Sequence, residues 1–141
     1  MREVRLALPA ELPACLALRR RVFVEEQRVP PELEVDGLDP TATHVVALQA
    51  DQVVGTARMR TVAGAGKAER VAVAPEARGQ GVGAALMSCL EGIASERGLQ
   101  VMTLHAQEAA IPFYERIGYE AYGPRFDDAG IPHRAMRRPI R

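Results

Sequence analysis

Four stretches in the first half of the chain either alternate polar and apolar residues with a period of two or are rich in β-branched residues. Both patterns are typical of β-strands. The stretches are residues 2–8, 43–48, 52–60 and 67–73. Ala50-Asp51 and Gly64-Ala65-Gly66 supply turn residues between the last three. We therefore predict one strand followed later by a three-stranded antiparallel meander.

Two longer stretches place apolar residues at helical spacing. The first covers about residues 11–25. Pro13 has no backbone N–H. It fits this helix only in the first turn, where N–H groups have no intrahelical acceptor in any case, so the helix begins close to Ala10. The second covers residues 82–97, with apolar residues at i, i+3, i+4 and i+7. A third, shorter helix is predicted for residues 109–117.

The segment between the first helix and the meander predicts irregular structure. Pro30 and Pro31 exclude a continued helix, so residues 29–34 are expected to form a loop, and the Asp, Gly and Pro of residues 36–40 are strong turn formers. The run Arg19-Arg20-Arg21 lies on the first helix, and we interpret it as a solvated face.

After the second helix, residues 99–105 predict a buried strand. A right-handed crossover places this strand parallel to residues 67–73. Residues 119–122 and 131–138 predict two final strands, joined by residues 125–130. The order of elements therefore predicts an α/β (α+β) fold, with a mixed and mostly antiparallel sheet of about six to seven strands flanked by helices.

Length, composition and charge limit the classes of protein to which this chain can belong. A chain of 141 residues with 48% hydrophobic residues fits one domain, residues 1–141, and 18 basic against 18 acidic residues favour neither nucleic acid nor a membrane surface. Cys15 and Cys89 lie in helical patterns without metal-binding or C-x-x-C spacing, so we predict buried thiols and no metal. Without an apolar run of membrane-spanning length or a signal sequence after Met1, we expect a soluble cytoplasmic protein.

One glycine-rich stretch carries the clearest chemistry. Arg78-Gly79-Gln80-Gly81-Val82-Gly83-Ala84 lies between the strand at residues 67–73 and the start of the second helix. The first N–H groups of a helix have no intrahelical acceptor, and the helix dipole adds positive charge there. Glycine removes the Cβ atoms that would keep an anion away, and Arg78 adds a permanent cation. The stretch therefore predicts a diphosphate site.

Two common diphosphate motifs do not fit this stretch. Gly83 is followed by alanines, so the lysine and hydroxyl of a nucleotide P-loop are missing. The third glycine comes one position too early for a dinucleotide fingerprint, and the following strand, residues 101–104, does not end in an acid for a ribose hydroxyl. The residues alone leave a tight strand-to-helix turn as the alternative reading.

Residues 78–83 match the acyl-CoA signature Arg/Gln-x-x-Gly-x-Gly/Ala, so the stretch resembles that of the GNAT family of N-acetyltransferases. The order of elements is also similar to the GNAT fold. The resemblance implies acetyl-CoA as cosubstrate and pantetheine lying along the main chain of Val71-Ala72-Val73, with a backbone N–H that polarises the thioester carbonyl. These three residues can also simply pack in the core.

A second segment, Phe113-Tyr114-Glu115-Arg116-Ile117-Gly118-Tyr119, resembles the F-Y-x-x-x-G-F/Y segment of the same family. The resemblance places Phe113 and Tyr114 at the cofactor and makes Tyr114 the general acid for the departing thiolate. A phenol with a pKa of about 10 is protonated at neutral pH. The alternative is an aromatic residue packed at a helix end.

A general base is needed because a lysine-type amine has a pKa of about 10.4 and costs roughly 4 to 5 kcal/mol to deprotonate at neutral pH. Glu69, which we expect on the same strand face as Val71 and Val73, is the first candidate. His105, at the end of the parallel strand, is the second. Either residue can instead be a solvated strand-end side chain.

Further segments resemble the ElaA-like branch of the GNAT family. They are residues 21–27, 34–39 and 105–107, His44, and residues 126–136, in which Asp128 stands where the branch has Glu. The shared polar residues Glu26, Asp36, His44 and His133 are candidates for an acceptor pocket, because acids suit a cationic amine. They can equally be loop clamps.

The sequence therefore predicts an enzyme that moves an acetyl group from acetyl-CoA to the primary amine of a small molecule or peptide, without metal or covalent intermediate. We expect a monomer or homodimer. The alternative is a module that binds acyl-CoA as a sensor without turnover and does not need Tyr114. A nucleic-acid binder using the C-terminal arginines is disfavoured by the zero net charge.

Overall fold

The computed structural model describes residues 2–140. Its strands are β1 (Arg2–Leu6), β2 (Thr43–Gln49), β3 (Gln52–Val62), β4 (Ala65–Val73), β5 (Val101–Gln107), β6 (Glu120–Asp128) and β7 (Ile131–Pro139). Its α-helices are α1 (Leu12–Arg19), α2 (Pro31–Glu34), α3 (Val82–Glu96) and α4 (Ile111–Arg116). A π-helix, η2 (Arg20–Glu26), continues α1, and short 3-10 turns are η1 (Pro9–Glu11), η3 (Asp39–Thr41), η4 (Pro75–Ala77) and η5 (Glu108–Ala110).

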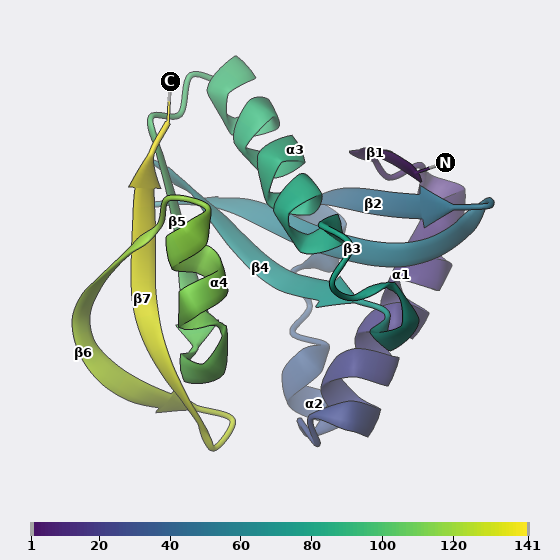
Figure 1. Ribbon diagram of the computed structural model, residues 1–141, viewed down its shortest axis with the longest axis horizontal. Coiled ribbons are helices and arrows are strands. Elements are labelled where there is room, and N and C mark those ends of the chain that lie inside the picture. Colours follow the sequence, from purple (N-terminus) through teal and green to yellow (C-terminus); the bar gives the residue numbers. More distant parts are fainter. Residues whose placement is uncertain (1, 141) are drawn as a thin grey trace.

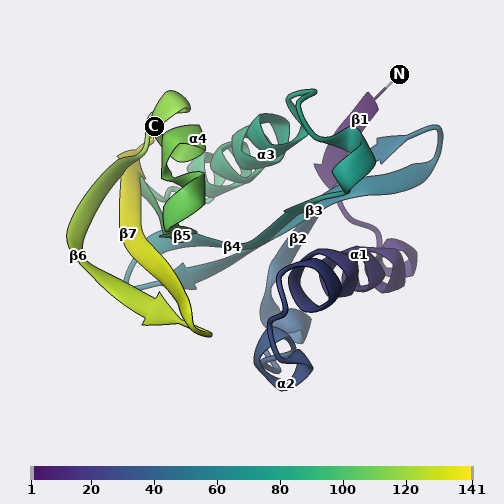
Figure 2. The same ribbon diagram turned by 60° about the horizontal axis from the view of Figure 1, so that its bottom comes forward.

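Within these residues the strands form one seven-stranded sheet in the order β1-β2-β3-β4-β5-β7-β6. The β4–β5 pair is parallel and all other neighbours are antiparallel, which confirms the predicted mixed sheet and the crossover through α3. Helices α3 and α4 cover one face of the sheet, and α1 and α2 lie on the other (Figure 2). No helix in the described range is long and apolar enough to cross a membrane.

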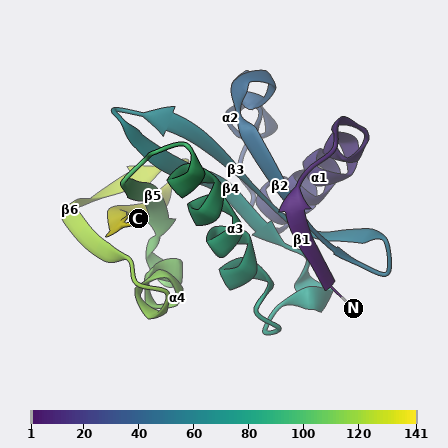
Figure 3. The ribbon, with the colours of Figure 1, turned by 90° about the horizontal axis from the view of Figure 1, so that it is seen from above.

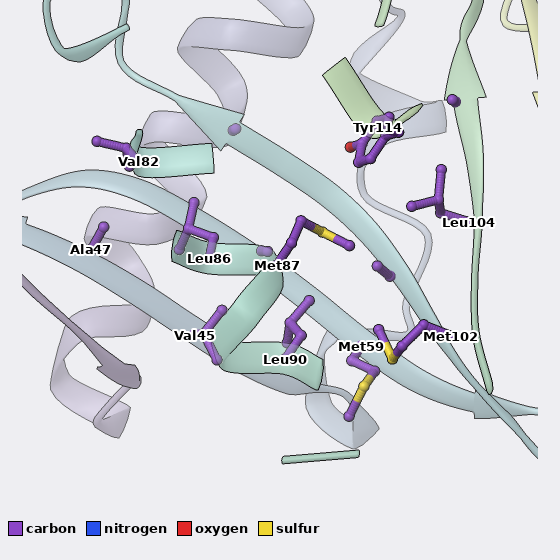
Figure 4. Close-up of a cluster of buried hydrophobic side chains, with 14 of the residues drawn as sticks. Val45, Ala47, Met59, Val82, Leu86, Met87, Leu90, Met102, Leu104 and Tyr114 are labelled. Atoms are coloured by element: carbon purple, nitrogen blue, oxygen red, sulfur yellow. The ribbon is translucent and has the colours of Figure 1, made fainter. Parts of the chain in front are cut away.

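The main core lies between α3 and the sheet. Leu86, Met87 and Leu90 are fully buried because the helical period brings them to one face, where they meet side chains of β2, β3 and β5 (Figure 4). Burying each such side chain contributes about 1.5–3 kcal/mol. Gly55 of β3 lets this helix approach closely, since a Cβ there would lie 2.7 Å from Val82. The core therefore fixes the N-terminus of α3 over the sheet.

Strands β4 and β5 pair over only a short distance. The register joins Gly66, Lys67 and Ala68 to Met102, Thr103 and Leu104. Beyond these pairs the two strands diverge toward the end of β4 (Figure 1). The main chain in the second half of β4 therefore has a strand partner on the β3 side only.

A β-bulge further exposes this part of β4. Arg58 pairs with Glu69 and Thr56 with Ala72, so two residues of β4, Arg70 and Val71, oppose one residue of β3. Arg70 has a positive φ of 55°, which is rare for a residue with a Cβ. The bulge leaves the main chain near Arg70 without regular pairing on either side.

The bulge also corrects the prediction that Glu69 shares a strand face with Val71 and Val73. Glu69 lies opposite Arg58, whereas Val73 lies opposite Gly55, and residues 55 and 58 of β3 point to opposite faces. The extra residue reverses the alternation, so Glu69 points to the α1 face. The sequence pattern has a period of two and does not show where a bulge interrupts it.

Two predicted loops contain regular structure. Residues 31–34 form the single turn α2, which Pro31 can begin because the first helical position needs no N–H partner. Strand β6 continues to Asp128 across a register shift between Tyr122 and Phe126, where a loop was expected. The arginine run was also partly misread, since Arg19 is 1% exposed.

Candidate functional site

The glycine-rich loop forms an open main-chain surface at the start of α3. Gly81 caps the helix with a φ of 81°, a conformation that glycine adopts freely. The Arg78 N–H donates to the Pro75 carbonyl at 3.4 Å. In contrast, the N–H groups of residues 79–84 donate to no acceptor within residues 2–140. These groups are therefore available to an anion at the positive end of a 15-residue helix.

Two arginines flank this loop. Arg78 makes a bidentate ion pair with Glu26, at 2.8 and 2.7 Å, and its Nε donates to the Val73 carbonyl at 3.1 Å. Arg2 donates to the Gln80 carbonyl at 2.7 Å, and β1 runs beside the loop that precedes α3 (Figure 3). The sequence motif identifies Arg78 but gives no signal for Arg2, because only the fold brings β1 to this place.

A cleft of about 280 Å³ opens where β4 and β5 diverge. Its walls come from β4 and β5, from η2 and α2 on one side, and from α4 and the β6–β7 hairpin on the other. The predicted site residues that line it are Glu69, Val71, His105, Tyr114 and His133. The predicted site residues Glu26, Asp36 and His44 are not among its lining residues.

Phe113 and Tyr114 connect α4 to both the glycine loop and the cleft. A Cβ on Gly83 would lie 3.1 Å from the Phe113 ring, so this glycine allows the two motifs to pack together. Tyr114 is 9% exposed and packs edge-on against Phe113 and Tyr119. Its hydroxyl has no hydrogen-bond partner among the described residues, and Figure 4 shows its oxygen on the side of β4.

Burial raises the pKa of Tyr114 to about 12, so the phenol is protonated at neutral pH. Full proton transfer to a thiolate with a pKa of about 8.5 would be uphill by roughly 5 kcal/mol. Tyr114 is therefore suited to donate a hydrogen bond to a developing thiolate rather than to give up its proton completely.

The surroundings of Glu69 argue against its predicted role as general base. Its carboxylate accepts hydrogen bonds from Arg58 and Arg60 and lies 3.5 Å from the Lys67 ammonium. Burial by itself raises the pKa of Glu69, but the hydrogen bond from Arg60 and the charges of Arg58, Arg60 and Lys67 outweigh this and lower the pKa to about 2. Such a carboxylate has very little affinity for a proton at neutral pH.

His105 is better suited to accept a proton. Partial burial and the Lys67 charge lower its pKa below the usual value, so the ring is neutral at pH 7. His105 packs edge-on against Phe126, with ring centroids 5.0 Å apart, and Phe126 stacks on His133. The Nδ1 of His133 donates to the Ile131 carbonyl at 2.7 Å, which leaves its Nε2 without a proton in the neutral ring.

The other residues predicted for the acceptor pocket bond to groups of the protein itself. Asp36 accepts hydrogen bonds from Arg58 at 2.9 and 2.7 Å, and its pKa is lowered chiefly by this interaction. His44 donates from Nε2 to the Asp39 carbonyl at 2.9 Å. Glu26 pairs with Arg78 at the glycine loop. The geometry therefore supports the alternative reading of Asp36 and His44 as loop clamps and places Glu26 beside the glycine loop.

The two thiols are not activated nucleophiles. Cys15 and Cys89 are both free, and burial raises the pKa of each. Cys15 is fully buried, as predicted, and Cys89 is half-buried. In the part of the chain that the structure describes, no group of three or more His, Cys, Asp or Glu side chains is arranged to hold a metal ion.

Comparisons with known proteins agree on one family. The model of an acetyltransferase (GNAT) domain matches residues 11–139. The uncharacterised N-acetyltransferase YjcF of Bacillus subtilis is 40% identical over 127 residues, which cover 89% of this chain and 91% of that protein. An acyl-CoA N-acyltransferase structure from Pseudomonas aeruginosa has a TM-score of 0.85 at 33% identity and covers 98% of both chains. Escherichia coli ElaA also has a TM-score of 0.85, at 30% identity, covering 98% of this chain and 99% of that chain. The chain therefore belongs to the GNAT acetyltransferase family and has its fold, as the motifs at residues 78–83 and 113–119 predict.

Proposed function

We propose that this protein transfers the acetyl group of acetyl-CoA directly to a primary amine in a ternary complex. The observation that carries the proposal is the free row of N–H groups at residues 79–84, in a loop whose Gly83 packs against Phe113, the neighbour of the Tyr114 that lines the cleft between β4 and β5. The row fits a diphosphate, and the cleft is lined by residues that can handle a thiol and an amine.

The diphosphate of CoA would bind the main-chain N–H groups of residues 79–84. Arg78 and Arg2 would supply positive charge on two sides of the loop. Because Arg78 pairs with Glu26, binding of the diphosphate requires the guanidinium to share or exchange this partner. The two arginines stand at the mouth of the site, where charge also steers an anionic ligand.

The thioester would lie against the bulge of β4. The main chain at Arg70 and Val71 lacks regular pairing, so an N–H there can donate to the thioester oxygen as negative charge develops. One such preorganised donor contributes about 3 kcal/mol to a tetrahedral intermediate. Ala72 and Val73 would hold the pantetheine amides on the unpaired side of the strand.

In the chemical step, the amine nitrogen forms a bond to the acetyl carbon and the carbon–sulfur bond breaks. His105 accepts the proton that the attacking amine loses, since its neutral ring lines the cleft. Tyr114 donates a hydrogen bond to the leaving sulfur. Glu69 is not assigned to the proton transfer, because its charge is held by Arg58, Arg60 and Lys67.

The proposal is tested by a panel of small-molecule and peptide amines with acetyl-CoA, following thiol release and confirming the acetylated product by mass spectrometry. CoA binding is measured separately by calorimetry. We expect CoA to bind and at least one amine to be acetylated. Binding of CoA with no acetylation across the panel would favour the sensor alternative, and absence of CoA binding would overturn the site itself.

A further inference from the structure

Arg70 stands at the junction between the bulge of β4 and helix α2. Its backbone is left-handed, with a φ of 55°, a conformation that disfavours every residue with a Cβ. A glycine would occupy this position without strain. The side chain that occupies this strained position carries a guanidinium with partners on α2.

The guanidinium of Arg70 is bonded to the end of α2. Its Nε donates to the Glu34 carboxylate at 2.9 Å, and its terminal nitrogen donates to the carbonyls of Leu33 and Glu34 at 3.3 and 3.2 Å. A weaker contact reaches Asp36 at 3.4 Å. Carbonyls in the last turn of a helix have no intrahelical donor, so an arginine at this end satisfies them.

Helix α2 depends on such contacts. It is a single turn of four residues, and a helix of this length is not stable alone in water. Glu34 is 4% exposed, and its carboxylate is shared between Arg19 and Arg70. Leu33 and Glu34 in turn line the cleft, together with Arg70 itself.

We propose that Arg70 is a positioning residue that holds α2 at a fixed place relative to the bulge of β4. In the proposed reaction α2 forms the wall beside the acceptor amine, and the bulge receives the thioester. This inference rests on the proposed function. One side chain thereby links the part of the site that binds the acyl carbonyl to the part that receives the acceptor. Arg60 and Lys67 instead contact Glu69, and within residues 2–140 neither of them bonds to α2.

Three variants test this role. Arg70→Gly removes the guanidinium but permits the left-handed backbone, so the bulge is retained. Arg70→Lys keeps the charge but loses the forked donor. Arg60→Ala is the matched control, since it removes a cation from the same cluster without touching α2. The readouts are amide hydrogen exchange of residues 33–35, the dissociation constant for CoA, and KM and kcat for the best amine of the panel.

For Arg70→Gly we expect exchange at residues 33–35 to rise about tenfold or more, because the contacts that hold this turn are lost. The KM for the amine should rise about tenfold, with the CoA dissociation constant within about twofold of wild type. Arg70→Lys should recover part of both effects, and it also serves if the glycine variant does not fold. Arg60→Ala should change neither.

Equal exchange at residues 33–35 in Arg70→Gly and Arg60→Ala would overturn the proposal. So would a loss of CoA affinity in Arg70→Gly without a change in the KM for the amine. If the wild-type protein acetylates no amine, the proposed function fails, but the exchange experiment still decides whether Arg70 holds α2.

Discussion

The two parts of the proposed site are built in different ways. The part proposed to bind the coenzyme, its coenzyme end, consists of main-chain N–H groups from a few consecutive residues, opened by glycines and flanked by exposed arginines. The part proposed to receive the amine, its acceptor end, lies against charged side chains far apart in the sequence, with Arg58 at 0% and Arg19 at 1% exposure among their carboxylate partners. Main-chain chemistry follows from local sequence, whereas a buried ion-pair network exists only in the folded chain.

The substitution with the largest expected effect tests how strongly the stability of the acceptor end depends on buried ion pairs. Arg58→Ala should lower the free energy of unfolding by about 3–5 kcal/mol, because Asp36, Asp39 and Glu69 all lose the cation they share. Urea unfolding measures this. The matched control is Arg21→Ala, which breaks an exposed bidentate pair with Glu76 and should cost about 1 kcal/mol or less. Similar losses in both variants would remove the contrast between the two ends.

The coenzyme end is tested by Gly81→Val. The new side chain would stand over the free N–H groups, so we expect CoA affinity to fall about 100-fold or more, as measured by calorimetry. Valine also strains a residue with a φ of 81°. Gly64→Val is the control, since Gly64 has a φ of 79° and open space around it and lies outside both the glycine loop and the residues that line the cleft. Tight CoA binding by Gly81→Val would contradict the anion site.

The same contrast explains what the sequence could and could not predict. The glycine loop and the long helix after it, α3, follow from local patterns, and the structure confirms both elements. The burial of Arg19 could not be predicted, because its partners Glu34 and Asp39 come from a later segment. The bulge at Arg70 was missed for a related reason. Nothing in the sequence of β4 shows that two of its residues lie opposite a single residue of β3.

Tyr114→Phe tests whether the hydroxyl of Tyr114 donates a hydrogen bond to the leaving sulfur. The hydroxyl has no protein partner in the described chain, so its loss should leave packing and CoA affinity nearly unchanged. We expect kcat to fall roughly 30-fold to 100-fold, within the usual range for a proton or hydrogen-bond donor in the transition state. Single-turnover kinetics with acetyl-CoA and the best amine measures this. An unchanged kcat would remove Tyr114 from the mechanism and favour packing alone.

The pH dependence tests His105 against Glu69. Because burial and Lys67 lower the pKa of His105 below 6.5, the wild-type rate should fall only when the pH drops below about 6.5, where the ring gains a proton. His105→Ala should lose about 10-fold to 100-fold in kcat at neutral pH, and the loss should shrink as the pH approaches the pKa of the amine. Glu69→Gln should keep the acidic limb, since a carboxyl with a pKa of about 2 does not titrate there.

The substitution with the smallest expected effect tests Glu26. The resemblance to the ElaA-like branch makes this residue a candidate for the acceptor pocket, whereas the structure pairs it with Arg78. Glu26→Gln frees Arg78 for the diphosphate. Because both side chains are about two-fifths exposed, at 41% and 42%, the gain in CoA affinity should be only about two- to fivefold and should diminish with added salt. Calorimetry at low and high ionic strength measures it. An acceptor role predicts the reverse pattern, with a raised KM for the amine and unchanged CoA affinity, so this one substitution decides to which end of the proposed site Glu26 belongs.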